Sequence, residues 1–281
     1  MHQGIKLYRR ISSGPLPWRL IVFFCWLLIL WAPLALLIYG VGALLNQASV
    51  AGTVAVVFLY LCFVVNAWVW GRWSHGWRNP FSAYGLVFNR PVLADAIWAM
   101  LFGVGLVAGL FGVEVLLGWA SFQPKFLGAI ALEGLAVGLG IGFAEELLFR
   151  GWLLAELDTG LSRLKAIVWS SLIFAVAHFI KPLPDVLQTS PQFIGLLLLG
   201  IILAIWRYGR CCGFPSLGLP IGLHSGLVWG YYIVDVADLV TPSEQVPEWV
   251  TGIHGNPLSG LWGLTILSCL VLLSAFRLHS E

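Results

Sequence analysis

The segment GFAEELLFRG places two adjacent glutamates and an arginine inside an otherwise apolar stretch. Glu146 and Arg150 are four residues apart, so on a helix they share one face and can form an ion pair. Glu145 is rotated by about 100° from Glu146 around the helix axis, so it is less well placed to form an ion pair with Arg150. The spacing predicts that Arg150 neutralises Glu146, whereas Glu145 faces the protein interior and is available as a general base.

Two histidines later in the chain add imidazole groups. His178 ends the string FAVAH, one helical turn after Phe174, and His224 precedes Ser225 in the string GLHSGLVWG. A lone histidine in a membrane helix usually forms a hydrogen bond to a neighbouring helix, and small residues beside it usually serve helix packing. A carboxylate with two imidazoles can instead activate a water and stabilise an oxyanion, or hold a metal ion. If zinc is bound, its expected ligands are His178, His224 and Glu145.

The elements that must position these residues are membrane-spanning helices. Of the 281 residues, 59% are hydrophobic and 10% are charged, whereas a soluble chain has about 25% charged residues. Residues 49–71 carry no charge at all, and a hydrocarbon core requires about 20 apolar residues of a helix. The composition excludes disordered, disulfide-rich, coiled-coil and nucleic-acid-binding proteins. It predicts an integral, multi-pass membrane protein, with the cell membrane as its expected location.

The apolar blocks predict an all-α fold, a polytopic bundle of about eight transmembrane helices. The spans are expected at residues 20–45, 48–70, 92–119, 126–155, 165–181, 192–207, 214–238 and 258–276. The basic residues test this arrangement independently, because cytoplasmic loops carry most of them. With the N-terminus in the cytoplasm, only Lys125 and Lys181 of the 15 lysines and arginines lie on the outer side. The eight spans therefore predict that both termini are cytoplasmic.

No internal repeat is visible, and no loop is long enough to hold a second soluble domain. We expect one integral membrane domain over residues 1–281, with the catalytic core in the spans of residues 126–240. The basic segment MHQGIKLYRR and the long apolar block after it predict an uncleaved signal anchor. The five cysteines show no metal-binding spacing and are interpreted as packing residues.

Three ionisable groups reach a similar depth in three of the predicted spans. At a rise of 1.5 Å per residue, Glu145, His178 and His224 lie about 15–20 Å from the inner ends of their spans, near the midplane of the bilayer. We expect these three side chains to meet there. Other acidic residues are expected to reach water at the interfaces: Asp95 at the inner one, and Glu114, Glu133, Asp235 and Asp238 at the outer one.

The order and spacing of these motifs resemble those of the CAAX-processing and bacteriocin-processing (CPBP) family of intramembrane proteases. The string EELLFR matches the glutamate-glutamate-x-x-x-arginine motif of that family, and FAVAH matches its phenylalanine-x-x-x-histidine motif. A further histidine follows two spans later, as His224 does. The similarity covers about residues 142–230, roughly a third of the chain. Each motif alone is common, and their specificity comes from their combination inside membrane spans.

The resemblance implies an intramembrane endopeptidase of the CAAX prenyl endopeptidase type, a class often described as metalloproteases. Glu145 and His178 would activate the attacking water, and His224 would help to stabilise the oxyanion. Glu146 and Arg150 would support the site as further members of the catalytic set. Beside the histidines, we place Phe174 and Ser225 as substrate-binding residues.

One position departs from the family pattern. The family usually has asparagine four residues after the last histidine, and this chain has Val228 there, which has no hydrogen-bond donor. Losing one oxyanion donor costs about 10²–10³ in rate. Either Ser225 or a backbone N–H replaces that donor, or the protein has reduced or altered activity. Metal dependence is also open, with zinc as the candidate cofactor.

Two other classes of function compete with a protease. The same groups would form a proton relay in a proton-coupled carrier, although carriers are commonly built from repeated halves. The second alternative is a catalytically inactive membrane scaffold of the same fold. Its best support is Val228, which lacks the hydrogen-bond donor of the family's asparagine. For a protease, the expected partners are the lipid bilayer and a membrane protein or lipidated peptide substrate, with no nucleic acid. The acidic loop of residues 241–257 is then a lid or a solvated connector.

Overall fold

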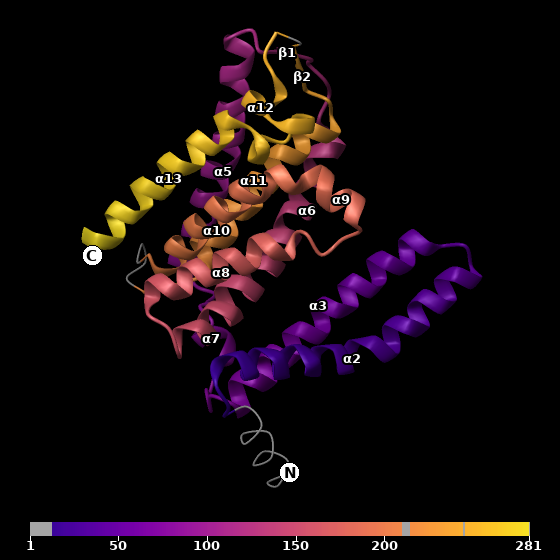
Figure 1. Cartoon of the computed structure of the whole chain (residues 1–281), viewed down its shortest axis with the longest axis vertical. Coiled ribbons are helices and arrows are strands. Elements are labelled where there is room, and N and C mark those ends of the chain that lie inside the picture. The colour runs from indigo at the N-terminus through magenta and orange to yellow at the C-terminus, as the bar shows by residue number, and fades with distance from the viewer. Residues whose placement is uncertain (1–12, 210–213, 244, 281) are drawn as a thin grey trace. The chain divides into compact units, whose positions relative to one another are not determined.

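A computed structural model of the chain describes residues 13–209, 214–243 and 245–280, with side chains described as far as Phe276. These residues are mostly helical (Figure 1), which confirms the prediction of a nearly all-α fold. They form two compact units, residues 1–83 and 84–281, and each unit is described by itself. The single domain predicted over residues 1–281 stays a prediction.

Some sequence predictions fall on residues that are not described. The segment MHQGIKLYRR lies outside the described residues, as do Cys211 and Cys212. The signal anchor and the interpretation of these two cysteines therefore stay predictions. Cys25, Cys62 and Cys269 are free thiols.

The first unit is a pair of long helices, α2 (Leu16–Leu44) and α3 (Ala48–Trp73), followed by the short α4 (Pro80–Ala83). A three-residue turn joins the two long helices, which lie side by side in Figure 1. Asn66 donates from its side-chain amide to the carbonyl oxygen of Phe23 at 3.1 Å, and this bond is buried. The indole of Trp31 donates to the carbonyl oxygen of Ala55 at 2.9 Å. These bonds fix the register of two faces that are otherwise apolar.

The second unit contains the remaining helices, in the following order. It begins with α5 (Arg90–Leu116), α6 (Gly128–Glu146), the π-helical segment η1 (Leu147–Leu153) and α7 (Leu154–Asp158). Next come α8 (Arg163–Ala177), α9 (Leu183–Thr189), the 3-10 turn η2 (Ser190–Gln192) and α10 (Phe193–Tyr208). The unit ends with α11 (Gly218–Val236), α12 (Glu248–Thr251), the 3-10 turns η3 (Ile253–Gly255) and η4 (Pro257–Ser259), and α13 (Leu261–Ser280).

A small β-sheet corrects the expectation of a purely helical chain. Strand β1 (Ala120–Phe122) pairs antiparallel with β2 (Val240–Pro242), and Ser121 lies opposite Thr241. Each strand is three residues long, too short to show an alternating hydropathy pattern. The strands follow α5 and α11, which pack against each other, so the pairing depends on a tertiary contact.

In the described part of the chain, five helical stretches are long and apolar enough to cross a bilayer: Leu16–Leu44, Ala48–Trp73, Arg90–Leu116, Gly128–Asp158 and Leu183–Tyr208. They confirm an integral, multi-pass membrane protein. Helix α8 has only 15 residues, and α13 contains a shorter apolar stretch, Leu261–Phe276. Helix α11 is long enough to cross a bilayer, but it is not among these five stretches. Its glycine and polar residues, which serve helix packing and the candidate site, make it less apolar. The eight spans and the cytoplasmic termini stay predictions.

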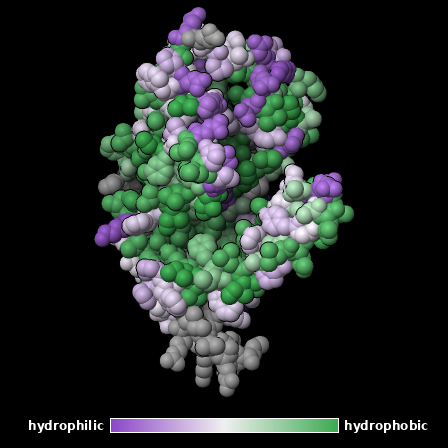
Figure 2. Space-filling view, turned by 45° about the vertical axis from the view of Figure 1, so that its right-hand side comes forward, coloured by the Kyte–Doolittle hydropathy of each residue, from purple (hydrophilic) through white to green (hydrophobic). Residues whose placement is uncertain are grey.

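The outward faces of these helices are apolar, as a lipid environment requires. Leu36 on α2 is 73% exposed, Val56 on α3 is 62% exposed, and Leu132 on α6 is 71% exposed. Figure 2 shows hydrophobic residues over much of the visible face. A soluble protein rarely exposes apolar surface of this extent, because its contact with water is unfavourable.

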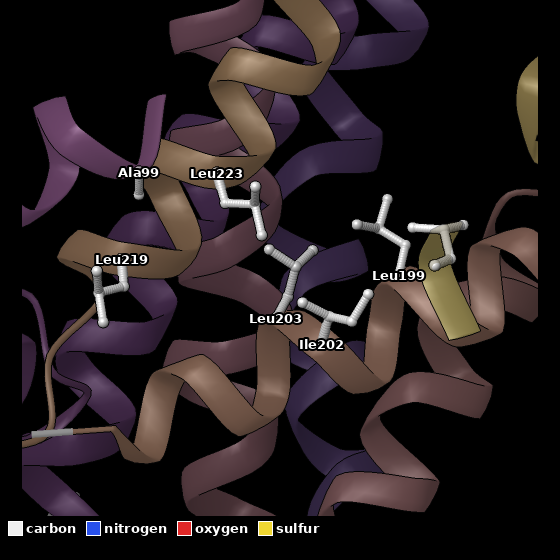
Figure 3. Close-up of a cluster of buried hydrophobic side chains, with 7 residues drawn as sticks. Ala99, Leu199, Ile202, Leu203, Leu219 and Leu223 are labelled. Carbon is white, nitrogen blue, oxygen red and sulfur yellow. The ribbon is translucent and has the colours of Figure 1, made fainter. Parts of the chain in front are cut away.

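The core of the second unit lies between α5, α10, α11 and α13. Figure 3 shows the buried cluster from which it is built, formed by Ala99, Leu199, Ile202, Leu203, Leu219, Leu223 and Leu267. Each of these side chains is at most 8% exposed. The cluster ties α11, which carries His224, to three other helices.

Glycines on α11 allow α5 to approach its backbone. A Cβ atom at Gly222 would collide with the carbonyl oxygen of Ala96, and one at Gly226 would collide with that of Met100. Close approach through small residues is a common way of packing membrane helices. On a neighbouring face of α11, Gly142 of α6 leaves room for Ser225.

We expect Gly226→Ala to destabilise the protein, because the added methyl meets backbone and cannot be relieved by a side-chain rotation. Overpacking of this kind costs about 1–3 kcal/mol. The measurement is the thermal unfolding temperature of the purified protein in detergent. Gly105→Ala on α5 is the matched control, since a Cβ there meets nothing within 4 Å. An equal unfolding temperature for both variants would contradict the close α5–α11 contact.

Glu114 differs from the expectation that it reaches water at the outer interface. Its exposure is only 3%, and its Oε1 atom has no hydrogen-bond partner among the described residues. Glu114 is buried because of tertiary packing, since its helix α5 packs tightly on α11. Glu133, Asp235 and Asp238 are exposed as expected, and Asp95 is half-buried.

Candidate active site

The two glutamates occupy the end of α6, where the helix changes its winding. Glu145 and Glu146 are the last two residues of α6, and the π-helical segment Leu147–Leu153 follows directly. A π-helical segment inserted into an α-helix is rare and often marks a functional site. Arg150 lies within this segment, yet its Nη1 atom still reaches Glu146 Oε1 at 2.9 Å. The winding places Glu145 and Glu146 in different surroundings.

Glu146 and Arg150 form a buried network that includes more partners than the motif predicts. Both side chains are fully buried. Oε1 of Glu146 accepts from Arg150 and also from Nδ1 of His224 at 2.8 Å. Nη2 of Arg150 donates to the carbonyl oxygen of Gly200 on α10 at 3.1 Å. The sequence predicts the ion pair but contains no signal for the bonds to His224 and Gly200, which come from other helices.

The aromatic ring of Phe174 packs this network against the two histidines. The Arg150 guanidinium lies 4.2 Å from the centroid of the ring. His178 and His224 face the same ring at centroid distances of 4.6 Å and 6.0 Å. Phe174 is fully buried and contacts the cavity described below. Its position serves the packing of the site, and its role as a substrate-binding residue stays a prediction.

Glu145 lies opposite both histidines, as the depth argument predicts. Its Oε2 atom is 3.7 Å from His178 Nε2 and 3.9 Å from His224 Nε2. These distances are too long for direct hydrogen bonds. The Glu145 side chain is 30% exposed, whereas that of Glu146 is fully buried. The structure thus brings a carboxylate that is not held by Arg150 to the same place as two imidazoles.

Both histidines are oriented by their Nδ1 atoms. His178 is the residue after the last one of α8, and its Nδ1 bonds to the carbonyl oxygen of Phe174 at 2.8 Å. A carbonyl only accepts, so this nitrogen carries the hydrogen. Nδ1 of His224 is held in the same way by the Glu146 carboxylate. In both rings Nε2 is therefore the nitrogen that faces Glu145, an arrangement by which proteins fix the reactive nitrogen of a histidine.

A cavity of about 440 Å³ opens at these groups. Glu145, His178, His224 and Phe174 line it, and most of the remaining wall consists of aliphatic side chains from α5, α10, α11 and α13. Val228, at the position where the family has asparagine, also lines it. A largely apolar cavity with a few converging polar groups is the usual form of a ligand or active site.

Ser225 is not among the residues that line this cavity. Its Oγ atom is buried without a hydrogen-bond partner among the described residues, and it lies on the side of α11 that faces Gly142. The structure therefore does not bring Ser225 to the other predicted site residues. Sequence reasoning also missed three polar residues of the cavity wall, Gln192, Tyr231 and Asn256.

Three donor atoms have the arrangement that most resembles a metal site. They are Glu145 Oε2 and the Nε2 atoms of His178 and His224. Around tetrahedral zinc, with bonds of about 2.0–2.1 Å, neighbouring donors lie about 3.4 Å apart. The two carboxylate–imidazole distances of 3.7 Å and 3.9 Å are somewhat wider. Across the described part of the chain, no group of three or more histidine, cysteine, aspartate or glutamate side chains is arranged to hold a metal ion. Zinc binding stays a prediction.

The fold and the site together define a multi-pass membrane protein with a glutamate–histidine centre inside a cavity. Residues 127–230 match the model of the family described as type II CAAX prenyl endopeptidase Rce1-like. The resemblance to CAAX-processing proteases is confirmed over this region, which contains all five predicted catalytic residues, and it indicates a protease. Comparison with curated proteins and with solved structures gave no significant match.

Proposed function

We propose that the protein is an intramembrane endopeptidase that hydrolyses a peptide bond in a membrane-associated or prenylated, CAAX-like substrate. The observation that carries this proposal is the convergence of Glu145, His178 and His224 on one cavity. The family match over residues 127–230 supports the reaction class. We place the site in a protein of eight spans with cytoplasmic termini in the cell membrane.

The spacing of the three groups suits a water molecule as the nucleophile. We place a water between the Glu145 carboxylate and His178 Nε2, where it donates one hydrogen bond to the carboxylate and one to the imidazole nitrogen. Glu145 removes one proton as the water oxygen attacks the carbonyl carbon of the substrate. The tetrahedral intermediate then collapses when Glu145 returns this proton to the nitrogen, and the carbon–nitrogen bond breaks. The products are a carboxylic acid and an amine.

His224 is placed to stabilise the negative oxygen of the intermediate. Its Nδ1–H is held by Glu146, so a proton taken up from solvent at Nε2 before the substrate reacts produces an imidazolium beside a carboxylate. The protonated Nε2 then donates to the oxyanion, a contribution that is large because the cavity wall is mostly apolar. Arg150 keeps Glu146 in position, and neither Glu146 nor Arg150 lines the cavity. These two residues therefore act through His224 and not on the substrate.

The experiment that tests the function compares cleavage of membrane-anchored and prenylated peptides by the purified protein. New peptide termini, read by mass spectrometry, identify the bond that is hydrolysed. A parallel reaction with a zinc chelator tests the metal prediction, since a zinc-dependent enzyme loses activity and regains it when zinc is added. The absence of new termini with every peptide would favour the inactive scaffold. A proton flux across proteoliposomes would instead favour a carrier.

Val228 supplies a specific prediction because it faces the cavity without a donor. We expect Val228→Asn to raise the rate of cleavage, by up to about 10²-fold, since an added oxyanion donor contributes about that much. The measurement is kcat on the same peptide. Leu227→Asn is the control, because Leu227 also lines the cavity but is the preceding residue on α11. An unchanged kcat in Val228→Asn would mean that another donor already serves the oxyanion.

A further inference from the structure

Two neutral amide side chains enter the cavity from neighbouring turns. Gln192 ends the turn η2, and Asn256 immediately precedes the turn η4. The two turns are in contact, and both side chains line the cavity that contains Glu145. Asn256 lies outside the region that matches the family, which ends at residue 230.

The Asn256 amide is held so that its oxygen is occupied and its nitrogen is available. Oδ1 accepts from the backbone N–H of Leu258 at 2.9 Å. The turn itself is locked by Ser259, whose Oγ donates to the carbonyl oxygen of Asn256 at 2.7 Å and accepts from the N–H of Ile253 at 2.9 Å. The Nδ2 group has no hydrogen-bond partner in the described part of the chain, and it is not among the fully buried unpaired atoms. It therefore keeps accessible surface on a residue that lines the cavity.

Gln192 contributes a second amide with both of its polar atoms available. Among the described residues, neither its oxygen nor its nitrogen forms a hydrogen bond, and the side chain is half-buried. Tyr231 is the other neutral polar residue that lines the cavity, and the nearby Asp235 carboxylate interacts electrostatically with its hydroxyl. Gln192 and Asn256 are the amide side chains among the described residues that line this cavity, and each has a hydrogen-bonding group without a protein partner.

A peptide in such a cavity needs partners of this kind. Each substrate residue brings one N–H and one carbonyl group, and leaving them unpaired against an apolar wall is costly. The aliphatic residues that form most of the lining offer no such partner. Glu145 and the Nε2 atoms of the histidines are committed to the reacting bond in the proposed mechanism. The substrate backbone on either side of that bond requires other groups.

We propose that Asn256 and Gln192 form an amide pair that binds the peptide backbone of the substrate. Nδ2 of Asn256 donates to a substrate carbonyl, and the Gln192 amide accepts from an N–H or donates to a second carbonyl. Backbone contacts of this type hold a peptide irrespective of its side chains. The inference rests on the proposed protease function and names two substrate-positioning residues for it.

The test uses Asn256→Asp, Gln192→Leu and Asn89→Asp in the full-length protein. Aspartate at 256 keeps the acceptor for the Leu258 N–H, removes the donor and adds a negative charge, for which the Asn89→Asp variant controls. Leucine at 192 removes the amide without adding a charge. Asn89→Asp is the matched control, since Asn89 also accepts from a backbone N–H, that of Val92 at 2.9 Å, and does not line this cavity. The probe is a farnesylated peptide ending in a CAAX tetrapeptide.

We expect KM for this peptide to rise about tenfold in Asn256→Asp and in Gln192→Leu, with kcat changed by less than about threefold, because one lost hydrogen bond is worth up to about tenfold in affinity. In the Glu145→Gln background, the Kd of the same peptide should rise by the same factor. Asn89→Asp should match the wild type in both assays. A purely structural role would lower the unfolding temperature and leave KM and Kd unchanged.

Failure of this inference is distinct from failure of the proposed function. If the wild type cleaves the peptide and Glu145→Gln does not, while both amide variants retain the wild-type KM and Kd, the amide pair is overturned and the protease stands. If the wild type neither cleaves nor binds the peptide, both proposals are overturned.

Discussion

Glu145→Gln is expected to lower the rate of peptide-bond hydrolysis by about 10²–10⁴-fold, the usual contribution of a general base. Glutamine keeps the shape of the side chain but does not accept a proton from the attacking water. The substitution is not expected to disturb the fold, because the Glu145 side chain is partly exposed to the cavity and is not bonded to Arg150. Its contacts with the histidines are also longer than hydrogen bonds.

The measurement compares kcat and the thermal unfolding temperature of the wild type and the variant in detergent. Glu133→Gln is the matched control, since Glu133 lies on the same helix and is exposed away from the cavity. The control should retain wild-type activity. Cleavage by Glu145→Gln at the wild-type rate would remove Glu145 from the role of general base and leave His178 as the next residue to test.

Breaking the buried pair of Glu146 and Arg150 should have the largest effect on folding. Glu146→Gln leaves the Arg150 guanidinium buried without its carboxylate, and Arg150→Ala leaves the carboxylate without its guanidinium. Removing one partner of a buried pair costs about 3–5 kcal/mol. Both variants should therefore give a lower yield of folded protein as well as lower activity. Glu146→Gln also weakens the bond that orients His224.

The yield of monodisperse protein after solubilisation and its unfolding temperature measure this effect. The double variant Glu146→Gln, Arg150→Met should recover part of the lost stability, because it leaves no buried charge, but it should not recover activity. Lys125→Ala is the control, since the pair of Lys125 and Asp238 is exposed and contributes little. Single variants with wild-type yield and unfolding temperature would contradict the buried network.

The predicted spans show what apolar composition determines. Each predicted span overlaps a helix or a continuous run of helices, because about 20 apolar residues in a row favour a helix in a bilayer wherever they occur. The predicted and observed ends of a helix differ where a polar side chain bonds to the backbone at the helix end. Helix α8 ends at Ala177, and the residue after it is His178, whose side chain bonds back to the last turn. The prediction continues this span to residue 181, since hydropathy does not detect such a bond.

The pairing of residues near one another in the chain was also accessible from the sequence. Glu146 and Arg150 form the expected ion pair because a spacing of four residues places them together on a helix. That spacing does not reveal the π-helical winding of Leu147–Leu153, whose side chains are mostly buried. Shared depth in the bilayer predicts that Glu145, His178 and His224 meet, and the structure brings them together.

Only the tertiary structure decided which faces of the helices meet. It directs Ser225 towards Gly142 and away from the cavity, buries Glu114 against expectation, and connects His224 to Glu146. It also brings Asn256, from a loop far along the chain, to the cavity wall. The sequence by itself determined the membrane class, the positions of the helices and the residues of the acidic motif, because these follow from local composition and spacing. Contacts between distant segments depend on how the helices rotate and pack, and no local pattern encodes that.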